Sequence, residues 1–236
     1  MRNVWTIARR DFIAFFHSAM AYIVVSVFLL LTNFFFFYSF FVQNMADVRN
    51  LFNLISIMSA FFAPAITMRL IAEERRSRSI ELLLSFPVTK LQVVLGKYLA
   101  AILLFSVMLG LTLIGPITIS AVADLDWGAI FGSYLGSLLL GSVYLGIGLV
   151  FSTVSRNQLV AVILGIAACL AISLGVEFAR VLMEGAMASF FDYLGVMSHF
   201  RSMSRGVIDS RDVIYYLSMS SFLVALSVYL LDRESA

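Results

Sequence analysis

Six long apolar segments, separated by stretches that hold most of the charged residues, dominate the hydropathy pattern of the chain. A helix needs about 20 apolar residues to cross the hydrocarbon core of a bilayer, and each segment has roughly that length. Continuous apolar runs of this kind are typical of membrane-spanning helices rather than of half-buried strands. The predicted spans are residues 19–42, 51–70, 98–122, 129–153, 158–176 and 213–231.

Residues 1–17, ahead of the first span, have an amphipathic pattern in which apolar side chains recur at helical spacing. This pattern predicts a helix that lies in the membrane interface, with aromatic and arginine side chains at headgroup depth. Its apolar face comprises Trp5, Ala8, Phe12, Phe15 and Phe16, and its basic residues are Arg2, Arg9 and Arg10.

Residues 177–212, between the fifth and sixth spans, form a connection too long for a tight turn. Two short amphipathic runs within it predict short helices. They comprise Phe178, Val181, Leu182 and Met183 in the first run and Phe190, Phe191, Leu194 and Met197 in the second.

Composition excludes an ordinary soluble domain. Hydrophobic residues make up 61% of the 236 residues and charged residues 13%, whereas soluble domains have roughly 45–50% and about 25%. A soluble fold of this size exposes too much surface to hide so many apolar side chains. We therefore predict an all-α polytopic membrane protein with one transmembrane domain over residues 1–236. A net charge of +2 gives no indication of nucleic-acid binding, and one cysteine and two histidines argue against a disulfide framework or a metal centre.

The distribution of lysine and arginine predicts the orientation of the spans. With both termini in the cytoplasm, the cytoplasmic connections hold eleven of these residues and the outer connections hold five. Basic residues are enriched in cytoplasmic loops, so we predict a multi-pass protein with both termini inside.

The predicted spans contain almost no ionisable side chains. Ion-coupled transporters, pumps and voltage sensors need charges at bilayer depth, so these classes are disfavoured. The sequence also has no phosphate-binding loop of the form GxxxxGK[ST], and no catalytic set stands out in it. We expect no catalytic residue, no metal and no cofactor bound by this chain. Asn33, the most polar side chain within a span, is a candidate for a transport pathway, the alternative being a hydrogen bond within or between helices.

The fourth predicted span is rich in small residues, which let helix backbones approach closely. Two interpretations are open: packing within the chain and an interface between subunits. The glycines concerned are Gly132, Gly136, Gly141, Gly146 and Gly148.

The connection between the second and third spans, residues 69–99, is the most informative polar stretch. A charged run is followed by an apolar run, a break at Pro87, and a capping-box pattern formed by Thr89 and Gln92. This order predicts a short amphipathic helix over residues 73–84 that ends before the proline. Three interpretations are open: a positive-inside anchor, a helix bound to anionic lipid, and a helix docked in a partner's groove. The acidic residues of the run disfavour anionic lipid.

This connection resembles the loop between the second and third spans of ABC-2-type transporter permeases. Those permeases carry a run of the form EERxxx[ST]xExLLxxP[VI], followed by GK at the start of the next span. The stretch 199–222 is similar to the gliding-motility-associated subgroup of these permeases. Arg78 and Ser79 stand where the family usually has Gly-Thr or Gly-Ser. The matching residues are Glu73, Glu74, Arg75, Ser79, Glu81, Leu82, Leu83, Pro87, Val88, Gly96 and Lys97.

The resemblance implies that residues 73–84 are a coupling helix, which docks on a separate ABC ATPase subunit. Two permease copies, as a homodimer, and two ATPase copies would form the transporter, with ATP and magnesium bound in the ATPase. Polar contacts with the ATPase are implied for Glu73, Glu74, Arg75, Arg76, Ser79 and Glu81, apolar anchoring for Leu82 and Leu83, and structural roles for Pro87, Thr89, Gly96 and Lys97.

The resemblance further implies a bacterial inner membrane and transport that is mostly export. The helix over residues 1–17, with Trp5, Arg9, Arg10 and Phe12, corresponds to a connecting helix beside the coupling helix. The short outer helices before the last span are implied to re-enter the membrane and cap the pathway. A further interpretation is that they bind an extracytoplasmic accessory subunit.

Three functions compete at this point. The first is an ABC permease without catalytic residues of its own. The second is a membrane scaffold or assembly subunit of a larger envelope complex that transports nothing. The third, an integral membrane enzyme, needs clustered ionisable groups at a membrane face, which the sequence does not offer. Binding of an ATPase at residues 73–84 distinguishes the first from the second.

Overall fold

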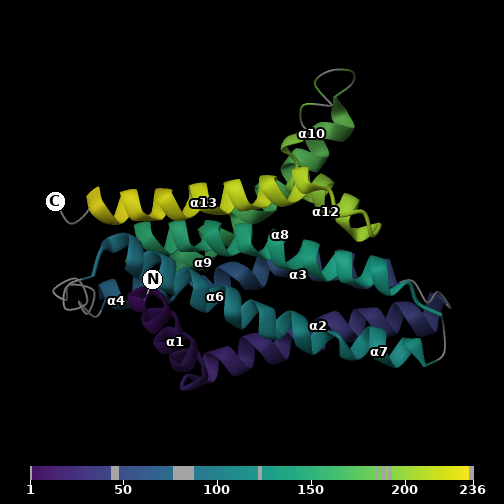
Figure 1. Cartoon of the computed structure of the whole chain (residues 1–236), viewed down its shortest axis with the longest axis horizontal. Helices are drawn as coiled ribbons and strands as arrows, with labels where there is room; N and C mark the ends of the chain where they lie inside the picture. The colour runs from purple at the N-terminus through teal and green to yellow at the C-terminus, as the bar shows by residue number, and fades with distance from the viewer. Residues whose placement is uncertain are drawn as a thin grey trace.

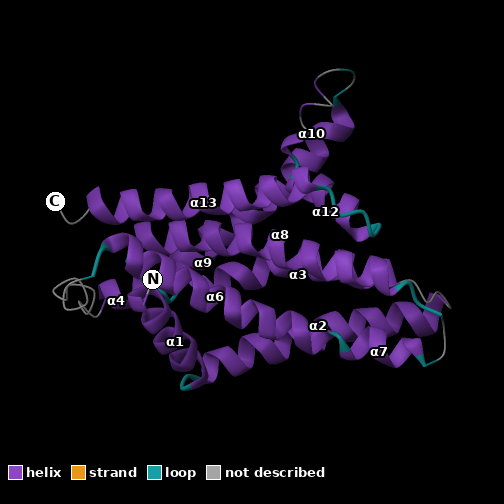
Figure 2. Cartoon of the chain, in the orientation of Figure 1, coloured by secondary structure: helices purple, strands orange, loops and turns teal. Residues whose placement is uncertain are grey.

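The computed structural model describes residues 2–43, 48–76, 88–121, 124–183, 185, 187, 190 and 193–233, and these form helices joined by turns and short loops, with no strand among them (Figure 2). Six of the helical segments are long and apolar enough to cross a membrane, which confirms the predicted all-α polytopic class. These candidate spans are Ala19–Tyr38, Arg49–Arg75, Lys90–Ser120, Trp127–Val154, Gln158–Ala179 and Ser210–Arg233.

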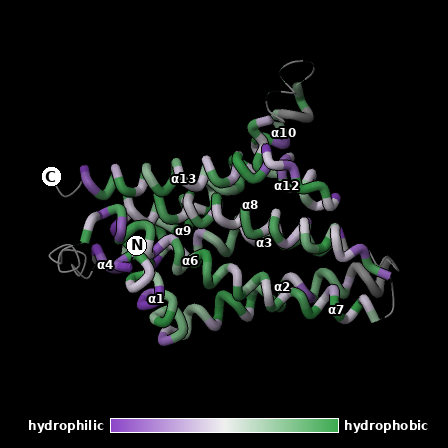
Figure 3. Tube along the Cα trace, viewed as in Figure 1, coloured by the Kyte–Doolittle hydropathy of each residue, from purple (hydrophilic) through white to green (hydrophobic). Residues whose placement is uncertain are grey.

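The long helices lie side by side in one elongated bundle (Figure 1). The N-terminal helix and the last turns of the C-terminal helix lie at the same end of it, as an even number of spans requires. Hydrophilic residues gather near the two ends of the bundle, and its middle is mostly hydrophobic (Figure 3). The helices are α1 (Arg2–Phe16), α2 (Ala19–Gln43), α3 (Val48–Thr67), α4 (Ala72–Arg76), α6 (Lys90–Thr112), α7 (Ile114–Ser120), α8 (Trp127–Val154), α9 (Gln158–Leu170), α10 (Val176–Leu182), α12 (Val196–Ser204) and α13 (Ser210–Arg233).

The third span begins earlier than its apolar run suggests. The Thr89 side chain accepts a hydrogen bond from the backbone of Gln92, and the Gln92 side chain accepts one from the backbone of Thr89, so the predicted capping box forms and α6 starts at Lys90. The helix then ends at Thr112 and restarts as α7. Pro116 explains the interruption, because it has no N–H to donate to the Thr112 carbonyl and its ring crowds that oxygen.

Helix α8 is the central helix of the bundle, since α3, α6, α9, α12 and α13 all pack on it. Its glycines permit these close approaches: a side chain at Gly141 would collide with Phe105 of α6, and one at Gly148 with Thr67 of α3. Gly146 faces Leu223 of α13 in the same way. Of the two interpretations of these small residues, packing within the chain is therefore the one that the structure shows.

Three helices have largely uncovered apolar faces. Leu30 and Phe34 of α2, Ile163 of α9 and Phe222 of α13 are each about three-fifths exposed. In a bilayer such faces contact lipid or a second apolar surface, so their exposure does not conflict with a stable fold.

The outer segment turns back onto the bundle. A π-helical turn, Ala171–Gly175, leads from α9 into α10, which projects away from the other helices (Figure 1). Helix α12 then packs on the outer end of α8, where Met203 faces Gly136. The Tyr216 hydroxyl donates to the Val196 carbonyl at 2.7 Å, which holds the start of α12 beside the second turn of α13. Re-entry of this segment into the membrane stays a prediction.

Candidate functional site

The short helix α4 follows a turn after α3 and contains the first residues of the predicted helix 73–84. Residues 77–87 of the motif lie outside the described residues, and these include Ser79, Glu81, Leu82, Leu83 and Pro87. The site is therefore built from Glu73, Glu74 and their neighbours.

One buried hydroxyl holds the turn between α3 and α4 in place. The Ser152 Oγ of α8 accepts hydrogen bonds from the backbone N–H groups of Ile71 and Ala72, each at 3.2 Å, and donates to the Met68 carbonyl at 3.1 Å. A hydroxyl offers one donor and two acceptor positions, so all three are used. Ser152 thus caps the end of the second span and the start of α4 together, and it ties both to α8.

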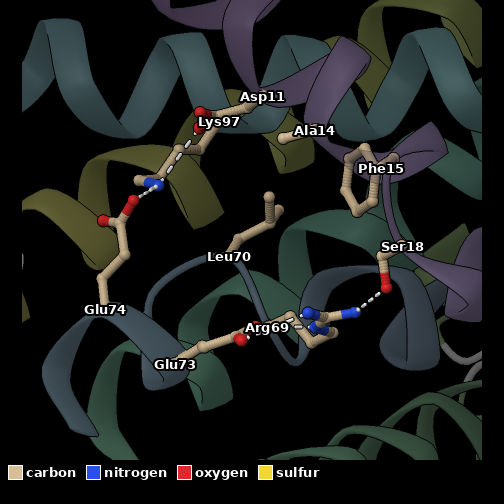
Figure 4. A pocket seen from close by; sticks show the side chains of 9 residues that line it. All are labelled: Asp11, Ala14, Phe15, Ser18, Arg69, Leu70, Glu73, Glu74 and Lys97. Atoms are coloured by element: carbon tan, nitrogen blue, oxygen red, sulfur yellow. Dashed lines mark hydrogen bonds and ion pairs between the residues drawn. The ribbon is translucent and has the colours of Figure 1, made fainter. Parts of the chain in front are cut away.

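Lys97 of α6 lies at the centre of a buried ion network (Figure 4). Its Nζ is 2.6 Å from Glu74 Oε1 of α4 and 3.1 Å from Asp11 Oδ2 of α1, and its side chain is only 2% exposed. Arg10 contacts both carboxylates, at 2.7 Å from Asp11 and 3.7 Å from Glu74. Two cations therefore face two carboxylates, and the cluster is neutral in sum. An ammonium this deeply buried is tolerable only because it is paired.

Helix α1 contacts the rest of the protein through a face that includes most of the predicted apolar residues and extends to Ile7 and Asp11. The predicted residues on it are Ala8, Phe12, Phe15 and Phe16. Ile7, Ala8 and Asp11 are its buried residues, whereas Trp5 is 60% exposed. Gly96 makes the contact possible, because a Cβ there would lie 2.7 Å from the Ile7 side chain. Arg9 is exposed and Phe12 is partly buried. The protein therefore binds α1 through one face and leaves Trp5 free to contact the membrane interface.

Asp11 is the functional residue that sequence reasoning missed. Its position four residues after Ile7, on the same face of the helix, is the local signal that was available. An acidic residue in line with the apolar stripe of an amphipathic helix indicates a buried partner, and the partner is Lys97.

A second ion pair lies across a cavity from the first. Arg69 contacts Glu73 at 2.6 Å and donates to the Ser18 hydroxyl at 2.6 Å, which links the end of the second span to the loop between α1 and α2. The cavity between these pairs has a volume of about 350 Å³ and is walled by α1 on one side and by residues 69–74 on the other (Figure 4). Its lining is Asp11, Ala14, Phe15, Ser18, Arg69, Leu70, Glu73, Glu74 and Lys97.

The structure thus brings together Glu73, Glu74, Gly96 and Lys97 of the predicted site, and it places Thr89 at the helix start just before them. The described contacts of Glu73 and Glu74 are within the chain. Arg75 is partly buried in α4, and contacts of these residues with a partner protein stay predictions.

Asn33 lies in the C-terminal half of α2, where its side-chain amide donates to the Leu29 carbonyl at 2.8 Å. This bond is the local alternative that the sequence left open, and a role in a transport pathway stays a prediction.

A separate polar cluster lies between α12 and the first turn of α13. His199 of α12 contacts Asp212 of α13 at 2.7 Å through Nδ1 and the Tyr193 carbonyl at 3.0 Å through Nε2, and its ring stacks on Tyr215. Arg201 forms a bidentate pair with Glu177. The described residues contain no group of three or more His, Cys, Asp or Glu placed to hold a metal ion.

Comparison with known proteins assigns this arrangement to a family. A family model described as ABC-2 family transporter protein matches residues 5–231, a range that begins within α1 and ends within α13. Among curated proteins, none matches the chain.

Proposed function

Since the chain belongs to the ABC-2 family of transporter proteins and is the membrane-spanning permease subunit of an ABC transporter, we propose that a separate ATPase drives it through the cytoplasmic segment 73–84. Family membership implies an ABC ATPase as partner. Nucleotide-driven motion would enter the membrane helices through segment 73–84.

The observation that carries this proposal is the double pairing of Lys97. A force that the ATPase applies to segment 73–84 acts first on α4, which contains the first residues of that segment. Glu74 passes it to Lys97 in the third span, and Asp11 connects the same ammonium to α1. Breaking a buried pair by removing one partner costs about 3–5 kcal/mol, so α1, α4 and α6 move as one rigid body. The Ser152 hydrogen bonds extend that body to α8, on which most other helices pack.

The two glutamates then differ in role from the residues that follow them. Glu73 and Glu74 act within the chain, where they hold α4 against Arg69 and Lys97. We propose that the ATPase is contacted by the rest of the segment, with polar side chains around an apolar anchor. These are Arg75, Arg76, Ser79, Glu81, Leu82 and Leu83.

The working assembly that we propose contains two copies of this chain as a homodimer and two ATPase subunits, which bind ATP and magnesium. Both termini face the cytoplasm of a bacterium, the membrane is the inner membrane, and transport is export. The excess of basic residues in the connections on the terminal side supports the orientation, and the uncovered apolar faces of α2 and α9 leave room for a second copy.

The outer segment supports two finer proposals. The first is that the chain belongs to the gliding-motility-associated subgroup of these permeases, and the similarity of residues 199–222 supports it. Helix α10, which projects from the bundle, is the element best placed to contact an extracytoplasmic accessory subunit (Figure 1).

The test is co-purification of the tagged chain from its own membrane, followed by assay of ATP hydrolysis. We expect an ATP-binding subunit whose hydrolysis rate depends on this chain. Arg76→Glu in α4 should release that subunit, whereas Arg211→Glu, an exposed arginine at the outer end, should not. An Arg76→Glu variant that stays bound and coupled would show that segment 73–84 is not the docking element. Purification without any ATP-hydrolysing subunit would favour the scaffold function instead.

A further inference from the structure

The exposed face of α1 combines basic and apolar side chains. Four of its exposed residues recur every three or four positions, so they form one stripe along the helix. This stripe lies opposite the buried residues that dock α1 on α6. We call it the basic stripe, and it consists of Arg2, Trp5, Arg9 and Ile13.

The positive charge of the basic stripe is not neutralised by the residues that the structure describes. Asp11, the single acidic residue of α1, is buried on the opposite face and pairs with Lys97. Arg10 belongs to the same ion network. Within the described ranges, Arg2 and Arg9 contact no carboxylate. The stripe therefore presents two uncompensated cations, and it is complementary to a negatively charged surface.

The position of α1 favours a membrane as that surface. Helix α1 lies across the direction of the long helices (Figure 1), at an end of the bundle where hydrophilic residues gather (Figure 3). A helix that lies across the ends of membrane-spanning helices lies in the plane of the interface, where tryptophan is enriched. Trp5 and Ile13 alternate with the arginines, so the stripe suits headgroups and the adjoining hydrocarbon together.

We propose that the basic stripe binds anionic phospholipid, with lipid phosphates on Arg2 and Arg9 and with Trp5 between them at headgroup depth. The planar guanidinium of arginine offers two parallel donors to a phosphate. Each basic residue near a negatively charged membrane also adds to the attraction. Asp11 holds the opposite face of α1 to Lys97, so the helix is fixed between the bundle and the membrane surface. The site does not depend on the ATPase.

The test uses Trp5 as its own reporter, because the chain has only two tryptophans. The other, Trp127, is the first residue of α8, which begins at the opposite end of the bundle (Figure 1). The full chain carrying Trp127→Phe is purified alone and reconstituted in bilayers of phosphatidylcholine and phosphatidylglycerol. One of the two lipids is brominated in its acyl chains, and quenching of the Trp5 fluorescence measures how often that lipid lies beside the stripe.

At equal mole fraction, we expect brominated phosphatidylglycerol to quench Trp5 more strongly than brominated phosphatidylcholine. Each arginine should raise the relative binding constant of the anionic lipid about fivefold, and added salt should reduce the preference. The double variant Arg2→Gln and Arg9→Gln should abolish it. Arg211→Gln, which removes an exposed arginine from the first turn of α13, should leave it unchanged.

The matched control is Trp5→Phe, in which Trp127 reports from the opposite end beside the acidic Asp126 and should show no such preference. Equal quenching of Trp5 by the two lipids would overturn the proposal. A preference that the double arginine variant retains, or one of the same size at Trp127, would overturn it as well. So would the absence of quenching by either lipid, because the stripe would then face water or a protein. The lipid comparison needs no arginine variant, so it decides the matter even if the double variant does not fold.

Discussion

The Nζ of Lys97 lies 2.6 Å from Oε1 of Glu74, so a motif residue two turns into the third span is paired with a motif residue of α4. The two residues are 23 positions apart in the chain. Their pairing explains why one motif contains two distant parts. A glutamate pair stands before the apolar run, and a glycine and a lysine follow the proline.

Replacing the buried cation should strongly destabilise the protein. Lys97→Met leaves two carboxylates facing each other without their ammonium, and we expect a loss of about 3–5 kcal/mol in the free energy of unfolding. The control is Lys90→Met in the same helix, which breaks an exposed pair with Asp232 and should cost no more than about 1 kcal/mol. Thermal unfolding in detergent measures both. Equal melting temperatures for the two variants would contradict the central position of Lys97.

A methyl group at Gly96 should detach α1. The added Cβ meets the branched Ile7 side chain at 2.7 Å, and overpacking of this kind costs about 1–3 kcal/mol. Gly110→Ala in the same helix has open space around it and should stabilise the helix by up to about 1 kcal/mol. Trypsin cleavage after Arg9 and Arg10 reports the docking of α1. We expect faster cleavage in Gly96→Ala alone, and unchanged cleavage would mean that α1 tolerates the methyl group.

Removing the Ser152 hydroxyl should loosen α4. Ser152→Ala leaves the N–H groups of Ile71 and Ala72 without their buried acceptor, which costs about 1–3 kcal/mol. Ser221→Ala, which removes a hydroxyl bonded to its own exposed helix, should change stability by less than about 0.5 kcal/mol. Hydrogen exchange at residues 68–76 would show faster opening only in Ser152→Ala. Protection equal to the unchanged protein would exclude a capping role.

Much of the fold follows from local sequence chemistry. Long apolar runs predict the spans, the Thr89 and Gln92 pair predicts the start of α6, and the glycines of α8 predict close helix contacts. Each of these signals acts within a few residues. The sequence could not specify which helix each glycine meets, because that depends on the arrangement of the whole bundle.

The central site was only partly predictable for the same reason. Lys97 and Glu74 belong to a recognisable motif, but Asp11 lies 86 residues from Lys97 and Ser152 lies 81 residues from Ile71. A serine within an apolar helix resembles many others that bond to their own backbone, as Ser137 does. Burial decides its role, and burial is a property of the folded bundle.

The separation of Asp11 from Lys97 also bears on how the protein is made. While the chain emerges from the ribosome, α1 is complete long before the third span has been synthesised. Until then the Asp11 carboxylate and the Ile7 side chain have no docking surface. Helix α1 can therefore dock on Gly96 and Lys97 only after the third span has been made.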